Sequence, residues 1–339
     1  MRGRLLHEAA MLLAALVGTV VIGCGGGGAT PSTPSNEDPA GGGGGGAGGS
    51  NGAGGGGAIG SHCTVFPTDN PWNQDISNAA VDPNSDRYVA SLGRDKKLHP
   101  DFGSNPSYGI PYIVVPGTQP KLPVRFEEPR ESDPGPYPIP LNAPVEGGES
   151  ASGDRHVLAI DRERCVLYEL YAAQAQSDMW HAYSGAVFDL RSNKLRPAGW
   201  TSADAAGLPI LAGLVRYEEA GGGGEIRHAL RFTANRTQNA FVRPATHASG
   251  STSDPSVPPM GARFRLKASF DTSKFRGSAK SVLTALKRYG MFLADNGSSW
   301  YLSGEANSKW NDDDLGQLKT IPGSAFEVVE IDEIVKNPS

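Results

Sequence analysis

The chain is poor in several features that define common protein classes. It has only 3 cysteines in 339 residues and no Cys-x-x-Cys pair, which excludes a zinc ribbon or a thioredoxin-type redox site. No apolar run is as long as the roughly 18 to 20 residues of a membrane-spanning helix. Lys and Arg are interspersed with Asp and Glu at a net charge of −5, so the concentrated basic stripe of a nucleic-acid-binding protein is missing.

The common catalytic signatures are also missing. The predicted folded region contains no Gly-x-Ser-x-Gly elbow, no His-Glu-x-x-His motif and no phosphate-binding glycine loop. The glycine runs at 25–28 and 41–46 follow no predicted strand and precede no predicted helix, so they do not indicate nucleotide binding. The function must therefore be inferred from individual side chains.

The N-terminal segment has the pattern of an export signal. Basic residues at its start precede a short apolar stretch over 11–23, and small residues lead to Cys24. The tetrad Val21-Ile22-Gly23-Cys24 resembles the lipobox of bacterial lipoproteins. The resemblance implies that residues 1–23 are cleaved as a signal peptide and that Cys24 is diacylated. We therefore expect an exported protein anchored by lipid to the cell envelope, at the outer membrane.

A glycine-rich segment separates this signal from the rest of the chain. Residues 25–60 contain 18 of the 45 glycines and almost no large apolar side chain, so they cannot bury enough surface to fold. We interpret 24–60 as the lipidated cysteine followed by a flexible tether. Residues 61–339 are numerous enough to bury a core, and we interpret them as a single large domain.

Two cysteines remain after lipidation, Cys63 and Cys165. In an oxidising compartment their expected state is one disulfide that ties the start of the domain to a central strand. The alternative is two separate buried thiols. Two cysteines so far apart do not predict a zinc site.

Alternating apolar residues predict a β-hairpin. Its strands cover 156–160 and 165–171, and four charged residues lie between them. If the two strand ends beside this loop face each other, the register places His156 directly opposite Glu169. Their face also carries apolar residues, so we expect the imidazole and the carboxyl group to be partly desolvated and within hydrogen-bond distance.

Other segments predict a mainly β domain, a sandwich or barrel-like fold with long loops and a few short helices. Strands are expected at 111–115, 185–190, 210–217, 225–232, 290–294, 300–303 and 326–331. Helices are expected at 86–92, 278–289 and 312–318. The sequence Thr201-Ser-Ala-Asp204 has the form of a capping box.

Alternate prolines over 133–140 exclude a central strand there. They predict an extended, stiff surface segment in which Tyr137 is a candidate wall of a ligand site. The competing interpretation is a spacer with no binding role.

The block 185–216, which includes Arg196-Pro-Ala-Gly-Trp200, resembles an uncharacterised type of secreted microbial protein. The resemblance covers most of the domain. It implies no particular fold, activity or catalytic residue.

The leading hypothesis is that the domain acts on a polysaccharide such as a cell-wall glycan, as a glycoside hydrolase that requires no cofactor. This chemistry typically needs two carboxyl groups, one of them an acid with a raised pKa. Glu169, beside His156, is the candidate acid because its predicted face is apolar. Asp189 is the candidate partner, followed by Asp204 and Asp295. The residues expected to contact the ligand are Tyr137, Trp200, Asp295, Trp300 and Tyr301.

Two other hypotheses remain open. A metal site would combine His156, Glu169 and His228, with His247 as a further ligand, because imidazole and carboxylate groups bind zinc, copper or iron. A non-catalytic surface module would bind glycan through the same aromatic residues. In each case the competing interpretation is that the polar residues have only structural roles.

Overall fold

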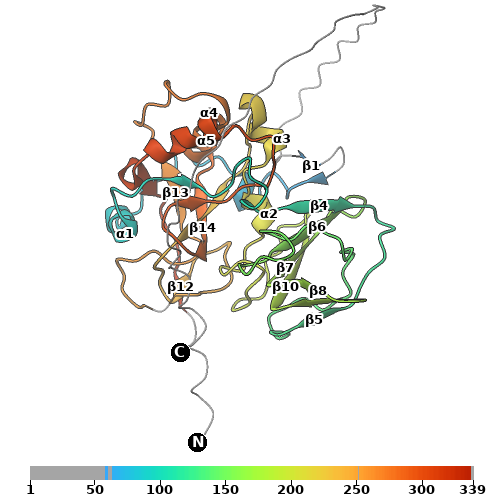
Figure 1. Ribbon diagram of the computed structural model, residues 1–339. Coiled ribbons are helices and arrows are strands. Elements are labelled where there is room, and N and C mark those ends of the chain that lie inside the picture. Colours follow the sequence, from blue (N-terminus) through green and yellow to red (C-terminus); the bar gives the residue numbers. More distant parts are fainter. Residues whose placement is uncertain (1–57, 60–62, 251, 337–339) are drawn as a thin grey trace, which may run out of the picture. The chain divides into compact units, whose positions relative to one another are not determined.

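A computed structural model describes residues 58–59, 63–250 and 252–336. These residues belong to one compact unit. They form a mainly β structure with several sheets and short helices (Figure 1), which confirms the predicted fold class. The proposed signal peptide, Cys24 and most of the proposed tether lie outside the described residues. No helix in the described ranges is long and apolar enough to cross a membrane.

One large sheet has four strands in the order β10-β7-β6-β4. β4 is parallel to β6, and the other neighbours are antiparallel. A three-stranded sheet in the order β5-β9-β8 lies beside it, and this part of the molecule curls into a half-barrel (Figure 1). The strands are β4 (Tyr112–Val115), β5 (Val124–Phe126), β6 (Val157–Asp161), β7 (Val166–Tyr171), β8 (Gln174–Ala175), β9 (Trp180–Ala182) and β10 (Ser184–Asp189).

β6 separates two hydrophobic cores. Leu158 and Ile160 pack into the larger core, whereas Val157 and Ala159 pack into a smaller core that includes Tyr137. Successive side chains of a strand point to opposite faces, so a strand covered on both faces is apolar along its length. All residues of β6 are accordingly buried.

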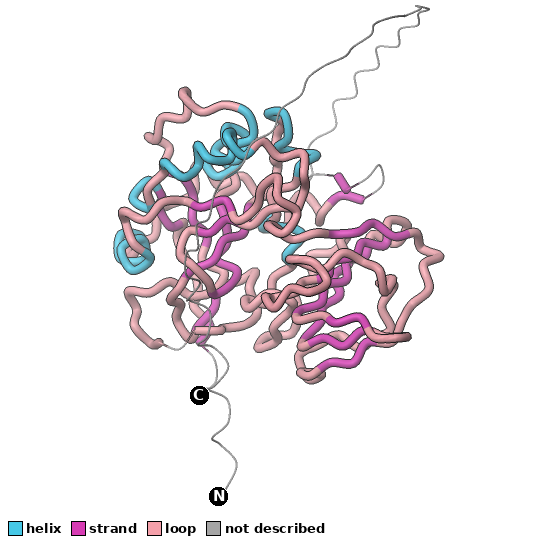
Figure 2. Tube along the Cα trace, in the orientation of Figure 1, coloured by secondary structure: helices cyan, strands magenta, loops and turns pink. Residues whose placement is uncertain are grey.

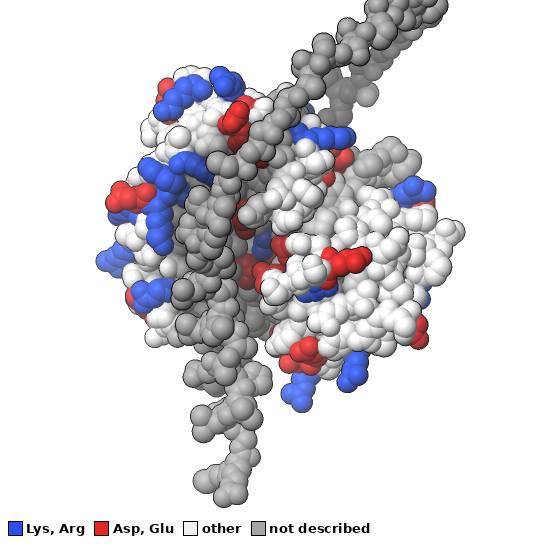
Figure 3. Space-filling view, in the orientation of Figure 1, with Lys and Arg blue, Asp and Glu red and all other residues white. Residues whose placement is uncertain are grey.

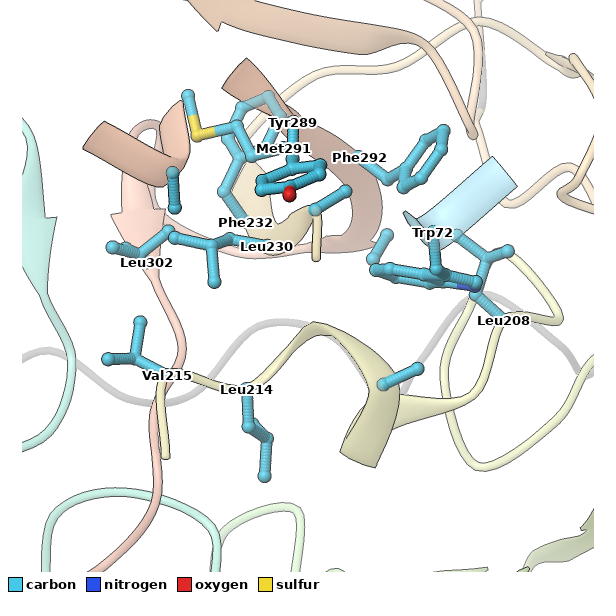
Figure 4. Packing of buried hydrophobic residues seen from close by; sticks show 14 of the residues in the cluster. Trp72, Leu208, Leu214, Val215, Leu230, Phe232, Tyr289, Met291, Phe292 and Leu302 are labelled. Carbon is cyan, nitrogen blue, oxygen red and sulfur yellow. The ribbon is translucent and has the colours of Figure 1, made fainter. Parts of the chain in front are cut away.

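The second large sheet has six strands in the order β16-β13-β14-β11-β15-β3. β11 is parallel to β14 and β15 is parallel to β3, while the other neighbours are antiparallel. Phe232, Met291 and Leu302 from this sheet pack in the large core with Trp72 and Leu214 (Figure 4). The strands are β3 (His99–Pro100), β11 (Leu230–Ala234), β13 (Arg263–Leu266), β14 (Met291–Asn296), β15 (Tyr301–Leu302) and β16 (Phe326–Val328).

The helices lie mostly beside the six-stranded sheet (Figure 2). They are α1 (Ser85–Leu92), α2 (Ile210–Gly213), α3 (Tyr217–Ala220), α4 (Gly277–Arg288) and α5 (Asp312–Gly316). Four 3-10 helices are η1 (Pro71–Asn73), η2 (Gly221–Gly223), η3 (Gln317–Thr320) and η4 (Gly323–Ala325). Two short ladders pair β1 (Ala58–Ile59) with β2 (Cys63–Thr64) and β12 (Ala240–Phe241) with β17 (Val335–Lys336).

The three helices predicted from periodicity correspond to α1, α4 and α5, with the last continued by η3. In α4 the predicted apolar face is fully buried, and the helix stops just before Gly290. Gly290 has a φ of 69°, and a Cβ there would lie 2.3 Å from the carbonyl oxygen of Phe264. Only glycine fits this helix stop.

Two of the predicted strands differ from the structure. Residues 210–217 contain α2 and the start of α3, because a buried carboxylate, that of Glu169, accepts hydrogen bonds from the first N–H groups of α2. The predicted strand 225–232 is correct only in its last three residues, since β11 begins at Leu230. The N–H of Ala229 donates instead to the carbonyl of Trp72 at 2.7 Å.

No helix begins at the predicted capping box, and the next one, α2, starts only at Ile210. Asp204 was expected to return to the start of a helix, but its carboxylate forms a bidentate contact with the guanidinium of Arg231. The hydroxyl of Ser202 donates to the carbonyl of Leu208, which closes a turn over this segment. The long-range ion pair therefore replaces the local cap.

Cys63 and Cys165 form the predicted disulfide, across a sequence separation of 102 residues. Cys165 lies in the loop directly before β7, an internal strand of the four-stranded sheet. The bond thus ties the first described strands to the central hairpin.

Candidate functional site

The hairpin that carries His156 and Glu169 has a different register from the predicted one. Cys165 belongs to the loop, so Glu169 pairs with Leu158 instead of His156. The shift is two residues, and a shift of two leaves every side chain on its original face. His156, just before β6, and Glu169 therefore point to the same side, but they are not hydrogen-bonded to each other.

The loop conformation explains this register. Asp161 pairs with Val166, and the Asp161 carboxylate accepts hydrogen bonds from the N–H groups of Glu163 and Arg164. Cys165 completes the turn with a φ of 52°. The period-two pattern alone does not reveal that a cysteine has left the strand.

Glu169 is fully buried and anchors α2. Its two carboxylate oxygens accept hydrogen bonds from the N–H groups of Ile210 and Leu211, both at 3.0 Å. Burial raises the pKa of Glu169 and the two hydrogen bonds lower it. The effect of burial is larger, so the pKa rises to about 7. The carboxyl group is thus occupied by the backbone and is not exposed to a ligand.

Asp189 is not near Glu169 in the way the sequence predicted. Glu169 pairs with Ala186 in β10, whereas Asp189 pairs with Val166 three positions further along. An odd spacing places the two carboxylates on opposite faces of the sheet. Asp189 is exposed and forms an ion pair with Arg191 at 3.1 Å.

His156 is buried and bonded to two acceptors. Its Nδ1 lies 2.6 Å from Oε2 of Glu146, and its Nε2 lies 3.0 Å from the carbonyl oxygen of Ala203. Since neither oxygen can donate, both ring nitrogens must carry protons. Burial by itself lowers the pKa of His156, but the charge and hydrogen bond of Glu146 raise it to about 9.

A second polar group centres on Arg231 in β11. Its guanidinium donates to both oxygens of Asp204, at 2.8 and 3.2 Å, and to the hydroxyl of Ser303 at 2.6 Å. Asp295 of β14 lies 3.6 Å from the same guanidinium and is 21% exposed, whereas Asp204 is completely buried. Burial and the charge of Asp204 raise the pKa of Asp295 well above its usual value.

These groups belong to one acidic cluster, which also includes two exposed carboxylates. The exposed residues are Asp101 and Asp154; partial desolvation by surrounding atoms raises the pKa of Asp101, and the charges of Glu146 and Asp154 raise it further. Figure 3 shows several acidic side chains close together near the middle of the face in view. The acidic cluster contains Asp101, Glu146, Asp154, Asp204 and Asp295, with Arg231 and His156 as its buried cations. Five carboxyl groups beside two cations favour retention of a proton by one of them.

Tyrosine rings border the acidic cluster. Tyr171 lies 5.5 Å from the His156 ring and 5.8 Å edge-on from Tyr183, which is 40% exposed. Burial, with the charges of Asp154 and Asp295, raises the pKa of Tyr171 to about 12, so this phenol stays neutral. The cluster therefore has an aromatic edge that suits stacking against a sugar ring.

The predicted ligand-contact residues are mostly elsewhere. Tyr137 and Trp300 are completely buried, so neither forms a ligand wall: the Tyr137 hydroxyl donates to the carbonyl of Asp133, and the Trp300 ring stacks on aromatic core residues. Trp200 is half-buried against Arg196. Tyr301 is half-buried and stacked on His99, with ring centres 4.2 Å apart.

The histidines proposed as metal ligands are held separately. His228 contacts Glu219 at 3.0 Å and the carbonyl of Ala229 at 2.8 Å, while His247 contacts the carbonyl of Ala205 at 2.7 Å. Neither shares a partner with His156 or Glu169. Across the ranges that the structure describes, no group of three or more His, Cys, Asp or Glu side chains has an arrangement that could hold a metal ion.

The sequence reasoning missed Asp101, Glu146, Asp154 and Arg231. An arginine flanked by apolar residues in a predicted strand was a usable signal for Arg231, because such a charge is rarely buried without a carboxylate partner. The three acidic residues lie in loops, where no periodicity indicates which neighbour they meet.

Comparison of the chain with protein-family models, with curated proteins and with solved structures found no match. The acidic cluster is therefore the basis for a proposal of function.

Proposed function

We propose that the protein hydrolyses a polysaccharide, with Asp295 as the general acid and Glu146 as the ionised partner carboxylate. The observation that supports this proposal is that the two pKa values are shifted in opposite directions within the acidic cluster, upward for Asp295 and downward for Glu146. Burial and Asp204 raise the pKa of Asp295, whereas His156 lowers the pKa of Glu146 despite partial burial. Two carboxyl groups tuned apart in this way match the acid and base roles of a glycosidase.

The solvent exposure of these two side chains supports the same assignment. The side chains of Asp295 and Glu146 are 21% and 24% exposed, unlike the fully buried carboxyl groups of Glu169 and Asp204. Asp295 would protonate the oxygen of the scissile glycosidic bond. Glu146 would either activate a water molecule or attack the anomeric carbon.

Neighbouring charged residues would keep Asp295 protonated and Glu146 ionised. Arg231 holds Asp204 in place at 2.8 Å, and the negative charge of Asp204 favours the protonated form of Asp295. The imidazolium of His156 favours the ionised form of Glu146. Asp295 thus replaces Glu169 as the proposed acid.

The proposed location fits a glycan substrate. An exported domain held at the cell envelope through Cys24 would meet polysaccharides outside the cytoplasm. The Cys63–Cys165 disulfide supports an oxidising compartment.

The test uses the full-length protein, purified in detergent and incubated with a panel of polysaccharides. We expect release of reducing ends, and a loss of roughly 100-fold or more in rate for Asp295→Asn and for Glu146→Gln. Asp178→Asn, at an exposed loop position, is the matched control and should retain full activity. An Asp295→Asn variant as active as the control would eliminate Asp295 as the acid.

Retention of a glycan without release of reducing ends would contradict hydrolysis and support a non-catalytic glycan-binding module. The aromatic edge formed by Tyr171 and Tyr183 would serve either activity. Binding and turnover are therefore measured on the same panel.

A further inference from the structure

A pocket of about 550 Å³ lies beside the acidic cluster and has the opposite charge. We call it the lysine pocket. The residues that matter for its chemistry are Lys96, Lys97, His99, Asn235, Tyr301 and Lys319.

The three lysines of this pocket form no ion pair in the described part of the chain, although the charge of Lys319 also acts on Asp312. All three are exposed, and no ammonium group among them lies within ion-pair distance of an Asp or Glu in the described part of the chain. In a chain with a net charge of −5, three unpaired lysines around one hollow form a local positive field. Such a field attracts an anion.

Asn235 adds a directional donor. The hydroxyl of Ser299 donates to Oδ1 of Asn235 at 2.6 Å. The amide NH2 group is therefore the end of this side chain that remains able to donate to a ligand. Lysine ammonium groups and an amide donor together suit an oxyanion.

The lysine pocket and the acidic cluster share one face of the six-stranded sheet. Thr233 pairs with Asp295 on one side and with Tyr301 on the other, and Tyr301 pairs with His99. Paired residues point to the same face. Three strand spacings of about 4.8 Å separate Asp295 from His99, or about 14 Å, so an oligosaccharide rather than a single sugar is needed to reach both.

We propose that the lysine pocket is a subsite for a negatively charged sugar unit of the glycan, bearing either a carboxylate or a sulfate group. This inference depends on the proposed glycan substrate but not on its hydrolysis. The acidic cluster repels the same anionic group, so the charge difference along the sheet face sets the direction in which the glycan lies. The stacked rings of His99 and Tyr301 lie at the junction of the two regions.

The experiment measures binding to the full-length protein carrying Asp295→Asn, so that turnover does not consume the probe. The probes are oligosaccharides with a single charged unit at one end, a uronate in one arm and a sulfated sugar in the other, each compared with the uncharged oligosaccharide of the same length. We expect the carboxylated or the sulfated probe to bind at least about tenfold more tightly than its neutral counterpart, and to bind more weakly as salt is added. The two anionic arms distinguish a carboxylate from a sulfate as the recognised group.

The variant that tests the pocket is Lys97→Gln with Lys319→Gln. It should weaken binding of the anionic probe roughly tenfold and leave binding of the neutral probe unchanged. Lys121→Gln with Lys194→Gln removes the same charge at exposed positions outside the lysine pocket and is the matched control.

Equal affinity for anionic and neutral probes, no binding of either anionic probe, or an unaffected Lys97/Lys319 variant would each overturn the subsite. Reducing-end release is measured separately with the unsubstituted protein. Selective anion binding without release would leave the subsite standing and remove hydrolysis. Release of reducing ends from a neutral glycan, with no effect of the lysine substitutions, would support hydrolysis and overturn the subsite.

Discussion

His156 is a buried histidine whose charge is imposed by its neighbours. Acceptor oxygens face both ring nitrogens, and one of them is the carboxylate of Glu146 at 2.6 Å. The sequence indicated that His156 would be desolvated beside an acid. It did not identify Glu146, because that contact joins a loop to the start of a strand.

The His156–Glu146 pair predicts a pH dependence of stability. The pKa of His156 rises from about 6.5 to about 9 on folding, so its stabilisation is complete below about pH 6.5 and is lost as the pH rises through about 9. The pKa of Glu146 is lowered, so its share is present above about pH 4.5 and is lost in more acidic solution. The pair therefore stabilises most between these limits.

Thermal unfolding at pH 6 and pH 9 checks this. We expect the pair to account for a fall in the free energy of unfolding on the order of 2 to 3 kcal/mol between these values, in addition to a fall from Glu169, whose pKa is raised to about 7. Glu146→Gln should remove the share that comes from the pair. Glu128→Gln should leave the fall unchanged. If the unsubstituted protein and both variants lost the same stability between pH 6 and pH 9, other groups would be the cause.

At the scale of elements, α2 shows how a short helix depends on tertiary contacts. Four residues are too few to form a stable helix alone. Glu169 binds its first N–H groups, and Gly213 allows close approach, since a Cβ there would lie 2.7 Å from Cβ of Arg231. α2 thereby packs directly on the strand that supplies Arg231 to the acidic cluster.

Glu169→Gln is expected to weaken this anchor. An amide offers only one acceptor oxygen, so one of the two backbone donors is left without its partner, at a cost of about 1 to 3 kcal/mol. Calorimetry should show a lower melting temperature than for Glu149→Gln, an exposed control. An unchanged melting temperature with lost activity would instead restore Glu169 as a catalytic residue.

The predicted elements were most accurate where the local pattern was strongest. The apolar face and glycine stop of α4 depend only on neighbouring residues, and this helix was placed to within one residue at each end. The segment 210–217 also alternates, but the buried carboxylate of Glu169, 41 residues earlier, makes its first part helical. Local periodicity does not contain that contact.

At the scale of the whole molecule, the acidic cluster is assembled from both large sheets. His156 and Tyr171 come from the four-stranded side, Arg231 and Asp295 from the six-stranded sheet, and Glu146 from a loop. Apolar residues of both sheets enter the same large core. The packing of that core therefore holds Asp295 and Glu146 in one cluster.

Loss of the disulfide should destabilise this arrangement as a whole. Cys63→Ser with Cys165→Ser opens a loop of 102 residues, which is worth up to about 4 to 5 kcal/mol in the chain-entropy account. Denaturant unfolding should give a lower midpoint than for the unsubstituted protein. The same midpoint for both would mean that the bond contributes nothing to stability.

Fold class, the disulfide and the common face of His156 and Glu169 follow from residue types and their spacing. Alternation specifies the face to which a side chain points, and a compartment that oxidises thiols leaves two cysteines one partner each. Alternation does not specify which residue each of these side chains contacts. Those contacts depend on loops and on long-range pairs such as Arg231–Asp204, which lie 27 residues apart in the sequence. Those contacts form only when two sheets pack together, and for that reason the surroundings of Asp295, the carboxylate of Glu146 and the lysine pocket became visible only in the folded molecule.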